Sequence, residues 1–510
     1  MQQSYTFNYL KIYLWQSISM VLNLLSMFVV IPRLADNPSI YGIYVLCISA
    51  NIFLTYADIG FAGAGYKYAS ECFAQKNLEE EIKIVGFVGF ILLLFVVVFA
   101  LTVSGIAFNP GILIKNIGIA AELRIASNLL FILALFSPVI IFQRILDIIY
   151  GIRLEQFIQQ QIMIPANVIK ILSAFYFFQS SRYDIVGYFL FCQLVNLSAI
   201  LSCLVIAKIR YKYDFIVFFK AFKFSKHVYN RTKNLAFGSL FITMMWILYY
   251  ELDAFAIAKL FGVESVAIYV VGFTVLTFIR SLFGILYGPF FARFNHLIGL
   301  NDIDSLRNLY LSIVTLTMPF VVFPIVSLAI LMDPFVYCWV GSHYQKSVVI
   351  AQLLILGCIY GFFTHPASFL IMAREKMKLL YLTAAISPVI YWTGIVLTLP
   401  YMGLTSFALF KFIVMSIVGL LYFVISLKFL DVSVSEFVKK ILGPVAIPTG
   451  FLILSLSCLN QYMPVEKSTS NLLIVVATGG LVSAGALLLY YLFSGHFRRY
   501  AQGLFRKCFA

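Results

Sequence analysis

The sequence predicts an all-α polytopic membrane protein, and three observations lead to that fold class. Of the 510 residues, 62% are hydrophobic and 11% are charged, whereas soluble chains carry about 25% charged residues. The apolar residues occur in blocks of roughly 19 to 26, the length that a helix needs to cross about 30 Å of hydrocarbon. The blocks are continuous, which excludes the alternating pattern of a transmembrane β-barrel.

Fourteen apolar segments are long enough to be transmembrane helices, and turn residues such as Asn109, Pro110 and Gly111 separate them. Their predicted ranges are 10–31, 40–64, 84–108, 125–149, 157–178, 185–209, 235–260, 266–290, 309–332, 348–372, 379–399, 404–427, 441–459 and 472–493. An even number of crossings places both termini on one side of the membrane.

The basic residues predict which side that is. If both termini are cytoplasmic, 26 of the 36 Lys and Arg lie in cytoplasmic segments or helix ends, three lie inside helices and seven face outward. The outward residues are Arg33, Lys115, Arg124, Arg182, Lys259, Lys346 and Lys467. This bias follows the positive-inside rule. It also accounts for the net charge of +15 without a nucleic-acid partner.

A long basic loop between the sixth and seventh segments divides the chain. We expect a six-helix bundle over 1–209, a basic cytoplasmic linker over 210–234, a second six-helix bundle over 235–428, and an extra helix pair with a basic cytoplasmic tail over 429–510. The linker is expected to be an electrostatic and mechanical joint and not a substrate site. Similar short runs at 33–45 and 259–270 favour duplicated halves, as in many transporters.

Three short runs near the N-terminus resemble a known family. Residues 31–34 (IPRL), 41–44 (YGIY) and 58–61 (DIGF) are similar to those of Wzx-type polysaccharide flippases of the multidrug/oligosaccharidyl-lipid/polysaccharide exporter superfamily. The resemblance is specific over residues 10–75 and diffuse elsewhere. Many relatives have twelve helices, so the last pair is a departure. Lipid II flippases of the superfamily also have fourteen, but the Arg-rich and Gly-rich signature expected in their first helix is missing.

The resemblance implies a function, a location and partners. The protein would move undecaprenyl-diphosphate-linked oligosaccharide repeat units, of O-antigen or a similar surface polysaccharide, from the cytoplasmic to the periplasmic leaflet of a bacterial inner membrane. A V-shaped cavity between two bundles would open alternately to either side. A polysaccharide polymerase and a chain-length regulator are expected partners. No cofactor is expected.

Polar stripes within the apolar helices predict where such a cavity is lined. A diphosphate bearing sugars cannot cross hydrocarbon unless the protein replaces its hydration. On the fifth segment Gln160, Asn167 and Lys170 share a face, and Asn23 lies on a polar face of the first. Carboxamides offer donors and an acceptor to sugar hydroxyls. The alternative for single Ser and Thr residues on other stripes is a bond back to their own helix.

Intramembrane charges are expensive and usually functional. Lys170 and Arg280, from different halves, are candidates to contact diphosphate or acidic sugars across the cavity, and Lys411 is a weaker candidate. Lys411 could instead reach the interface. A buried ion pair that only holds helices together is the alternative for any of these charges.

Three acidic residues are candidates for ion pairing or for coupling to a proton or sodium gradient: Asp58, Glu251 and Asp253. On one continuous helix Glu251 and Asp253 would lie about 160° apart, so they could not both face one cavity. Asp253 is favoured because it shares one face of the seventh segment with the polar residues Ser239, Thr243, Trp246 and Tyr250.

Enzymatic functions fit poorly. The sequence holds no GxSxG, P-loop or HExxH motif, and its five histidines are dispersed. A membrane polymerase would carry a large Arg-rich outward loop, and the outward loops here are short. The remaining alternative is a cation-coupled exporter of drugs or other small amphiphiles on the same scaffold, which would need a less cationic cavity.

Overall fold

The computed structural model describes residues 2–55, 60–114, 120–179, 182–300, 302–373 and 377–509. Contacts divide the chain into two compact units, Met1–Ala267 and Ile268–Ala510. Both units are helical, and the described residues hold one small sheet, the antiparallel pair β1 (Phe178–Gln179) and β2 (Arg182–Tyr183). The boundaries predicted at 209/210 and 234/235 stay a prediction.

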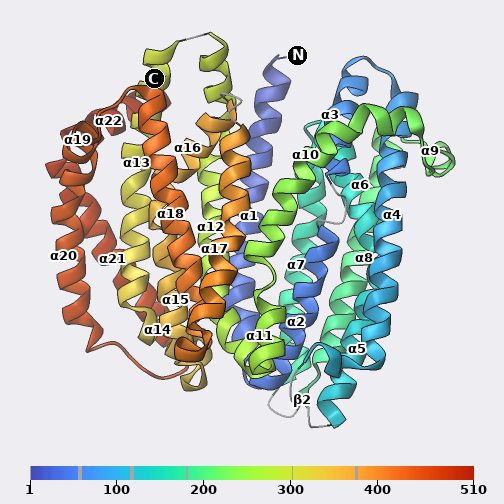
Figure 1. Ribbon diagram of the computed structural model, residues 1–510, viewed down its shortest axis with the longest axis horizontal. Coiled ribbons are helices and arrows are strands. Elements are labelled where there is room, and N and C mark those ends of the chain that lie inside the picture. Colours follow the sequence, from blue (N-terminus) through green and yellow to red (C-terminus); the bar gives the residue numbers. More distant parts are fainter. Residues whose placement is uncertain are drawn as a thin grey trace. The chain divides into compact units, whose positions relative to one another are not determined.

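The first unit contains eleven α-helices and the start of a twelfth (Figure 1). They are α1 (Gln2–Leu34), α2 (Pro38–Thr55), α3 (Phe61–Ala74), α4 (Leu78–Phe108), α5 (Ala120–Phe136), α6 (Val139–Ile152), α7 (Gln156–Phe177), α8 (Ile185–Tyr211), α9 (Phe215–Ala221), α10 (Lys226–Tyr250), α11 (Asp253–Phe261) and α12 (Val263–Gly299), with a 3₁₀ turn η1 (Pro110–Ile112).

The second unit contains the rest of α12 and ten further α-helices among its described residues. They are α13 (Ile303–Ile330), α14 (Met332–Val340), α15 (Ser347–Leu356), α16 (Gly361–Ala373), α17 (Met377–Met402), α18 (Thr405–Leu430), α19 (Val434–Phe437), α20 (Gly443–Asn460), α21 (Thr469–Phe493) and α22 (Gly495–Phe509), with short turns η2 (Ser342–Tyr344), η3 (Gly357–Tyr360) and η4 (Val438–Leu442). In Figure 1 the extra pair, α20 and α21, lies side by side and packs on α13.

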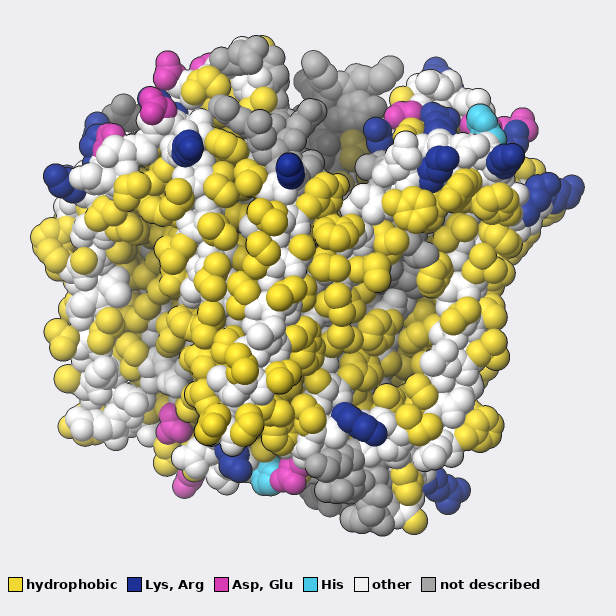
Figure 2. All heavy atoms as spheres, viewed as in Figure 1, with side chains coloured by type: hydrophobic (Ala, Val, Ile, Leu, Met, Phe, Trp, Pro, Cys, Tyr) yellow, Lys and Arg dark blue, Asp and Glu magenta, His cyan; other side chains and the backbone are white. Residues whose placement is uncertain are grey.

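The predicted all-α polytopic fold class is confirmed. Within the described residues, eleven helices are long and apolar enough to cross a membrane, and the bent pair α5 and α6 makes twelve. Of the remaining two predicted segments, 157–178 coincides with α7, and 40–64 begins within α2 and ends within α3. Figure 2 shows apolar side chains over the sides of the helices and most Lys and Arg near their ends, as expected for helices whose flanks face lipid.

Three predicted segments are interrupted or bent, and the last of them still forms one apolar span, 236–261. The second, 40–64, is interrupted because Gly60 has φ 75° and α3 starts after it. The fourth, 125–149, bends by 44° between α5 and α6, where Pro138 lacks an N–H and cannot continue the helical hydrogen bonds. The seventh, 235–260, breaks at Glu251 and Leu252, between α10 and α11.

Apolar packing of long helices forms the core of the first unit. Phe87 of α4 and Ile145 and Ile149 of α6 are fully buried in one cluster that also includes residues of α3, α8 and α10. The Tyr150 hydroxyl donates to the Cys203 carbonyl oxygen of α8 at 2.8 Å. This bond satisfies the one polar atom of a side chain that is otherwise buried in apolar surroundings.

The second unit is organised around α13. This helix packs against α15, α16, α20 and α21. Two hydroxyl pairs join it to its neighbours: Tyr310 with Ser426 of α18 at 2.9 Å, and Ser327 with Ser483 of α21 at 2.8 Å. Hydrogen bonds between helices of this kind stabilise packing where lipid offers no partner.

Candidate functional site

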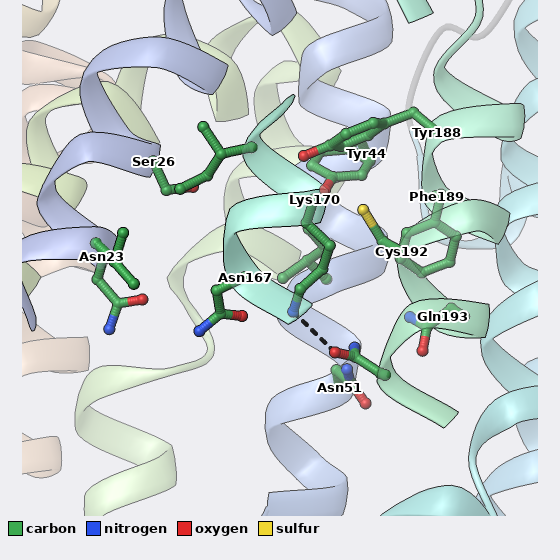
Figure 3. A pocket seen from close by; sticks show the side chains of 14 residues that line it. Asn23, Ser26, Tyr44, Asn51, Asn167, Lys170, Tyr188, Phe189, Cys192 and Gln193 are labelled. Carbon is green, nitrogen blue, oxygen red and sulfur yellow. Dashed lines mark hydrogen bonds between the residues drawn. The ribbon is translucent and has the colours of Figure 1, made fainter. Parts of the chain in front are cut away.

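Four helices of the first unit, α1, α2, α7 and α8, surround a pocket with a cavity volume of about 300 Å³ (Figure 3). Its lining residues are Leu22, Asn23, Ser26, Tyr44, Ile48, Asn51, Asn167, Lys170, Ile171, Tyr188, Phe189, Cys192, Gln193 and Asn196. A volume near 300 Å³ is at the lower end for small-ligand sites. The pocket can therefore hold a headgroup or about one sugar ring, not a whole oligosaccharide.

Helical spacing brings these residues to one wall from each helix. Asn23 and Ser26 are three residues apart on α1, as are Asn167 and Lys170 on α7. Residues three or four apart lie on the same helical face. Asn167 and Lys170 both point into the pocket in Figure 3, and Asn51 reaches it from α2. Residues that are far apart in the sequence thus line the same pocket.

The pocket is polar, and its charge has one sign. Among the fourteen described residues that line it, five carry carboxamides, one is Lys170, and none is Asp or Glu. The carboxamides are Asn23, Asn51, Asn167, Gln193 and Asn196. Each carboxamide can donate to and accept from hydroxyl groups. The arrangement suits an anionic or hydroxyl-rich group, and its described lining holds no carboxylate that could pair with a bound cation.

Lys170 is held by a carboxamide and not by a carboxylate. Its Nζ donates to Oδ1 of Asn196 at 2.8 Å, and the side chain is half-buried. Within the described part of the chain, no acidic residue forms an ion pair with it. An ammonium has three N–H donors, so the bond to Asn196 leaves donors for a bound group. A half-buried cation with only a neutral partner attracts anions strongly.

Aromatic rings form a further part of the wall. The Tyr44 ring packs edge-on against Phe189 at 5.8 Å and contacts Tyr188 at 6.5 Å. Tyr188 and Phe189 are buried, and Tyr44 is half-buried. Their packing joins α2 to α8. It fixes the spacing between the two helices that carry Asn51 and Asn196.

The structure places three of the predicted substrate-binding residues together. Asn23, Asn167 and Lys170 all line the pocket. Gln160 lies on α7 about two helical turns before Asn167 and does not line it. The neighbouring Gln159 is buried and donates to Asp147 at 2.7 Å, so it serves contact between α6 and α7.

The other two predicted cations lie in the second unit. Arg280 is half-buried on α12. Lys411 of α18 is fully buried, with Nζ 5.2 Å from the Phe273 ring centre and 5.1 Å from that of Tyr391. Aromatic faces attract cations at such distances. The expectation that Lys411 could reach the interface is wrong, because its side chain is fully buried.

Two of the three predicted acidic residues lie at the break between α10 and α11. Glu251 follows the last residue of α10, and the buried Asp253 begins α11. The angle of 160° assumed one continuous helix, and it does not apply across the break. Asp58 lies outside the described residues.

Three hydroxyl residues lie near Arg280 on α12, and each bonds to its own helix. Thr274 donates to the Val270 carbonyl at 2.8 Å, Thr277 to that of Phe273 at 3.0 Å and Ser281 to that of Thr277 at 3.0 Å. Hydroxyls bonded to their own helix need no external partner. Their spacing beside Arg280 is therefore no evidence for a binding face.

Sequence reasoning missed the contribution of α8. Gln193 and Asn196 bring two carboxamides to the pocket, and Asn196 is the partner of Lys170. Their spacing of three residues within an apolar helix is the signal that could have identified them. The aromatic wall had no such signal, since Tyr188 and Phe189 resemble any lipid-facing or core residues.

A second polar cluster lies elsewhere in the first unit and is structural. Arg153 forms an ion pair with Glu81 at 2.8 Å, and the two side chains are 7% and 1% exposed. The Arg153 guanidinium also lies 4.9 Å from the ring centres of Phe73 and Tyr211. These contacts tie the start of α4 to the end of α6. The pair compensates two charges that would be very costly if buried singly.

A neighbouring, more exposed pair adds to that cluster. Glu155 accepts hydrogen bonds from Arg210 at 2.7 and 2.8 Å and from the Tyr211 hydroxyl at 2.6 Å. The bond from Arg210 is the main reason why the pKa of Glu155 is lowered from its ordinary value, and partial burial opposes it. Glu155 therefore stays ionised and joins the α6–α7 turn to the end of α8.

Comparisons with known proteins identify the fold. No protein-family model matches the chain, and no curated protein matches it. Among solved structures, a lipid II flippase MurJ in an inward closed conformation matches with TM-score 0.65 and 16% identity over 92% of this chain and 98% of the other. An inward-facing multidrug resistance MATE family transporter of the MOP superfamily matches with TM-score 0.62 and 14% identity over 81% and 94%.

A third match concerns pocket charge. A MOP superfamily transporter from Pyrococcus furiosus, whose binding pocket is described as having reversed polarity, matches with TM-score 0.56 and 13% identity over 83% of this chain and 94% of the other. At such identities the likeness establishes the fold. The chain has the polytopic fold of the MOP-superfamily transporters and flippases.

Proposed function

We propose that the protein is a flippase for lipid-linked oligosaccharides. It moves undecaprenyl-diphosphate-linked repeat units from the cytoplasmic to the periplasmic leaflet of a bacterial inner membrane by alternating access, with both termini in the cytoplasm. The observation that carries the proposal is the first-unit pocket, which presents Lys170 and five carboxamides and no carboxylate among its described lining residues. The likeness to a lipid II flippase, which also handles a lipid-linked substrate, supports it.

The chemistry of the pocket matches the polar part of such a substrate. Lys170 compensates the hydration that a diphosphate or acidic sugar loses, and the carboxamides replace water at sugar hydroxyls. The polyprenyl chain stays in lipid, so the protein needs no apolar cavity of matching length. Arg280 of the second unit is the proposed second cation, because charged side chains within membrane segments are costly and usually functional.

Energy for the cycle would come from a proton or sodium gradient, with Asp253 as the favoured carrier and Asp58 and Glu251 as further candidates. The position of Asp253 supports this choice, because it is a buried acidic residue at the start of α11 and intramembrane acidic residues are usually functional. A polysaccharide polymerase and a chain-length regulator would act on the product and are the proposed partners.

The competing function is cation-coupled export of drugs or small amphiphiles, and one structural match is a multidrug resistance transporter. Cationic amphiphiles would need a carboxylate or an apolar aromatic cavity. The described lining of the pocket includes three aromatic residues, but it also includes Lys170 and no carboxylate. The lysine would repel a cationic amphiphile, so we favour the flippase.

One reconstitution experiment distinguishes the two functions. The full chain is placed in proteoliposomes with a fluorescent undecaprenyl-diphosphate-linked oligosaccharide or, separately, with the cationic dye ethidium. Loss of fluorescence to a membrane-impermeant reductant reports flipping of the lipid, and dye efflux reports drug export. We expect lipid flipping well above protein-free vesicles and no dye efflux. Dye efflux without lipid flipping would overturn the proposal.

A further inference from the structure

The short helix α9 is fixed to the first unit by one face. Phe218 is fully buried, and Phe222 packs on the same core cluster. On α4, Gly86 and Gly89 make this approach possible, because a Cβ would lie 2.8 Å from Ala221 at Gly86 and 2.4 Å from the Phe222 ring at Gly89. Two glycines three residues apart give α4 a flat surface against which α9 lies.

The N-terminal end of α9 is also defined. Asp214 caps the helix by accepting from the backbone N–H groups of Ile216 at 2.8 Å and Val217 at 3.1 Å. Such a cap satisfies donors that the first turn leaves open. The helix is therefore an ordered element beside α4 (Figure 1) and not a loose part of a linker.

The opposite face of α9 exposes large apolar side chains. Ile216 is 71% exposed and Phe219 57%, and Ile209, in the last turn of α8 before α9, is 74% exposed. Ile216 and Phe219 are three residues apart and so lie side by side on the helix. Exposed apolar groups of this size in one place mark a surface that contacts lipid or a partner.

Basic side chains surround these apolar groups. Residues 208–226 contain six Lys or Arg and a single acidic residue, Asp214, which is used as the helix cap. Lys208, Lys212, Lys220 and Lys223 are all exposed, and within the described part of the chain none of the four forms an ion pair. Figure 2 shows the dark blue side chains gathered around this helix.

The position of α9 along α4 indicates how deep α9 lies in the membrane. The first turns of α4 are charged, from Glu79 to Lys83, and the helix is apolar from Ile84 onward. The contacts with α9 are at Gly86 and Gly89, about 5 to 9 Å beyond Lys83 at 1.5 Å per residue. This is the level at which a transmembrane helix passes from the headgroup region into hydrocarbon.

We propose that α9, with the end of α8, is an interfacial anchor that binds anionic phospholipid. Ile209, Ile216 and Phe219 insert into the boundary between headgroups and acyl chains, and Lys208, Lys212, Lys220 and Lys223 contact lipid phosphates. An amphipathic element with apolar residues on one side and lysines at its border binds membranes in this way. Each lysine near an anionic surface contributes about 1 kcal/mol, or about fivefold in affinity.

Depth is tested with tryptophan at the exposed position. Phe219→Trp is made in the full chain, reconstituted in bilayers with brominated phospholipid, and its fluorescence is compared with that of the parent protein. Tyr462→Trp is the control, since Tyr462 is 76% exposed in the turn after α20. We expect bromine to quench the added fluorescence of Phe219→Trp and not that of Tyr462→Trp.

Headgroup selectivity is tested in the same variant. At equal mole fractions, brominated phosphatidylglycerol should quench Phe219→Trp at least about twofold more than brominated phosphatidylcholine. Adding Lys212→Gln, Lys220→Gln and Lys223→Gln should bring that ratio close to one. The matched control removes three exposed lysines of the second unit, through Lys378→Gln, Lys428→Gln and Lys439→Gln, and should leave the ratio unchanged.

Three outcomes decide the proposal. Quenching with a lysine-dependent preference for phosphatidylglycerol supports it. Quenching with equal response to both lipids would overturn headgroup binding. Absence of quenching would overturn the anchor altogether and assign the exposed face to a protein partner. Flipping measured in parallel reports the proposed transport function independently, since the lysine variants should retain it.

Discussion

Lys170 of α7 donates a hydrogen bond of 2.8 Å to the side-chain oxygen of Asn196 of α8. A neutral amide orients the ammonium without cancelling its charge, whereas a carboxylate would neutralise it. The pocket therefore presents a positioned cation to whatever enters it.

Replacing Asn196 with Asp tests the need for a neutral partner. The substitution nearly conserves shape but places a carboxylate against Lys170, and the resulting ion pair would compete with an anionic substrate. We expect flipping of a diphosphate-linked lipid in proteoliposomes to fall at least about tenfold, in line with one charge-assisted hydrogen bond. Asn230→Asp, at an exposed position of α10, is the control and should be neutral. Normal flipping by Asn196→Asp would show that the ammonium need not be free.

Arg153→Ala should destabilise the first unit without touching the pocket. Removal of the guanidinium leaves Glu81, whose side chain is 1% exposed, as an uncompensated buried charge, which costs about 3 to 5 kcal/mol. The free energy of unfolding in detergent measures the effect. Lys83→Ala removes a partner of the largely exposed Glu79 and should cost much less, because exposed ion pairs contribute little to stability. Equal effects of the two substitutions would contradict a special role for the buried pair.

The distribution of basic residues predicts topology. Reporter fusions after Lys226 and after Lys507 should give cytoplasmic signals, and fusions near Lys115 and Lys467 should give periplasmic ones. Alkaline phosphatase and green fluorescent protein activities of the same fusions provide opposite readouts. A periplasmic C-terminus would be incompatible with fourteen crossings.

Much of the architecture could be predicted because each transmembrane helix requires its own continuous apolar segment, which is visible in the local sequence. Apolar blocks of sufficient length give each helix its position, and the helix that carries Lys170 was identified from its own sequence. Breaks were harder to locate. Pro138 bends the fourth segment, whereas Pro165 lies inside the continuous α7, so a proline alone does not distinguish a bend from an uninterrupted helix.

The site could be predicted only in part. Asn23, Asn167 and Lys170 were found because each shares a polar face with other residues of its own helix. The Lys170–Asn196 bond joins residues 26 apart, and the Arg153–Glu81 pair joins residues 72 apart. Such pairings depend on how helices pack, and helical periodicity within one segment carries no information about them.

The most direct test of the flippase account is the rate at which Lys170→Ala flips an undecaprenyl-diphosphate-linked oligosaccharide, measured at equal amounts of inserted protein. We expect a loss of about 10- to 100-fold, because one charge-assisted hydrogen bond to phosphate is removed. Lys170→Arg should retain most activity, while Arg280→Lys should lose more, since only arginine holds a phosphate bidentately. Lys76→Ala, at an exposed position after α3, should be normal. Full flipping by both Lys170→Ala and Arg280→Ala would contradict the cationic pocket as the substrate site.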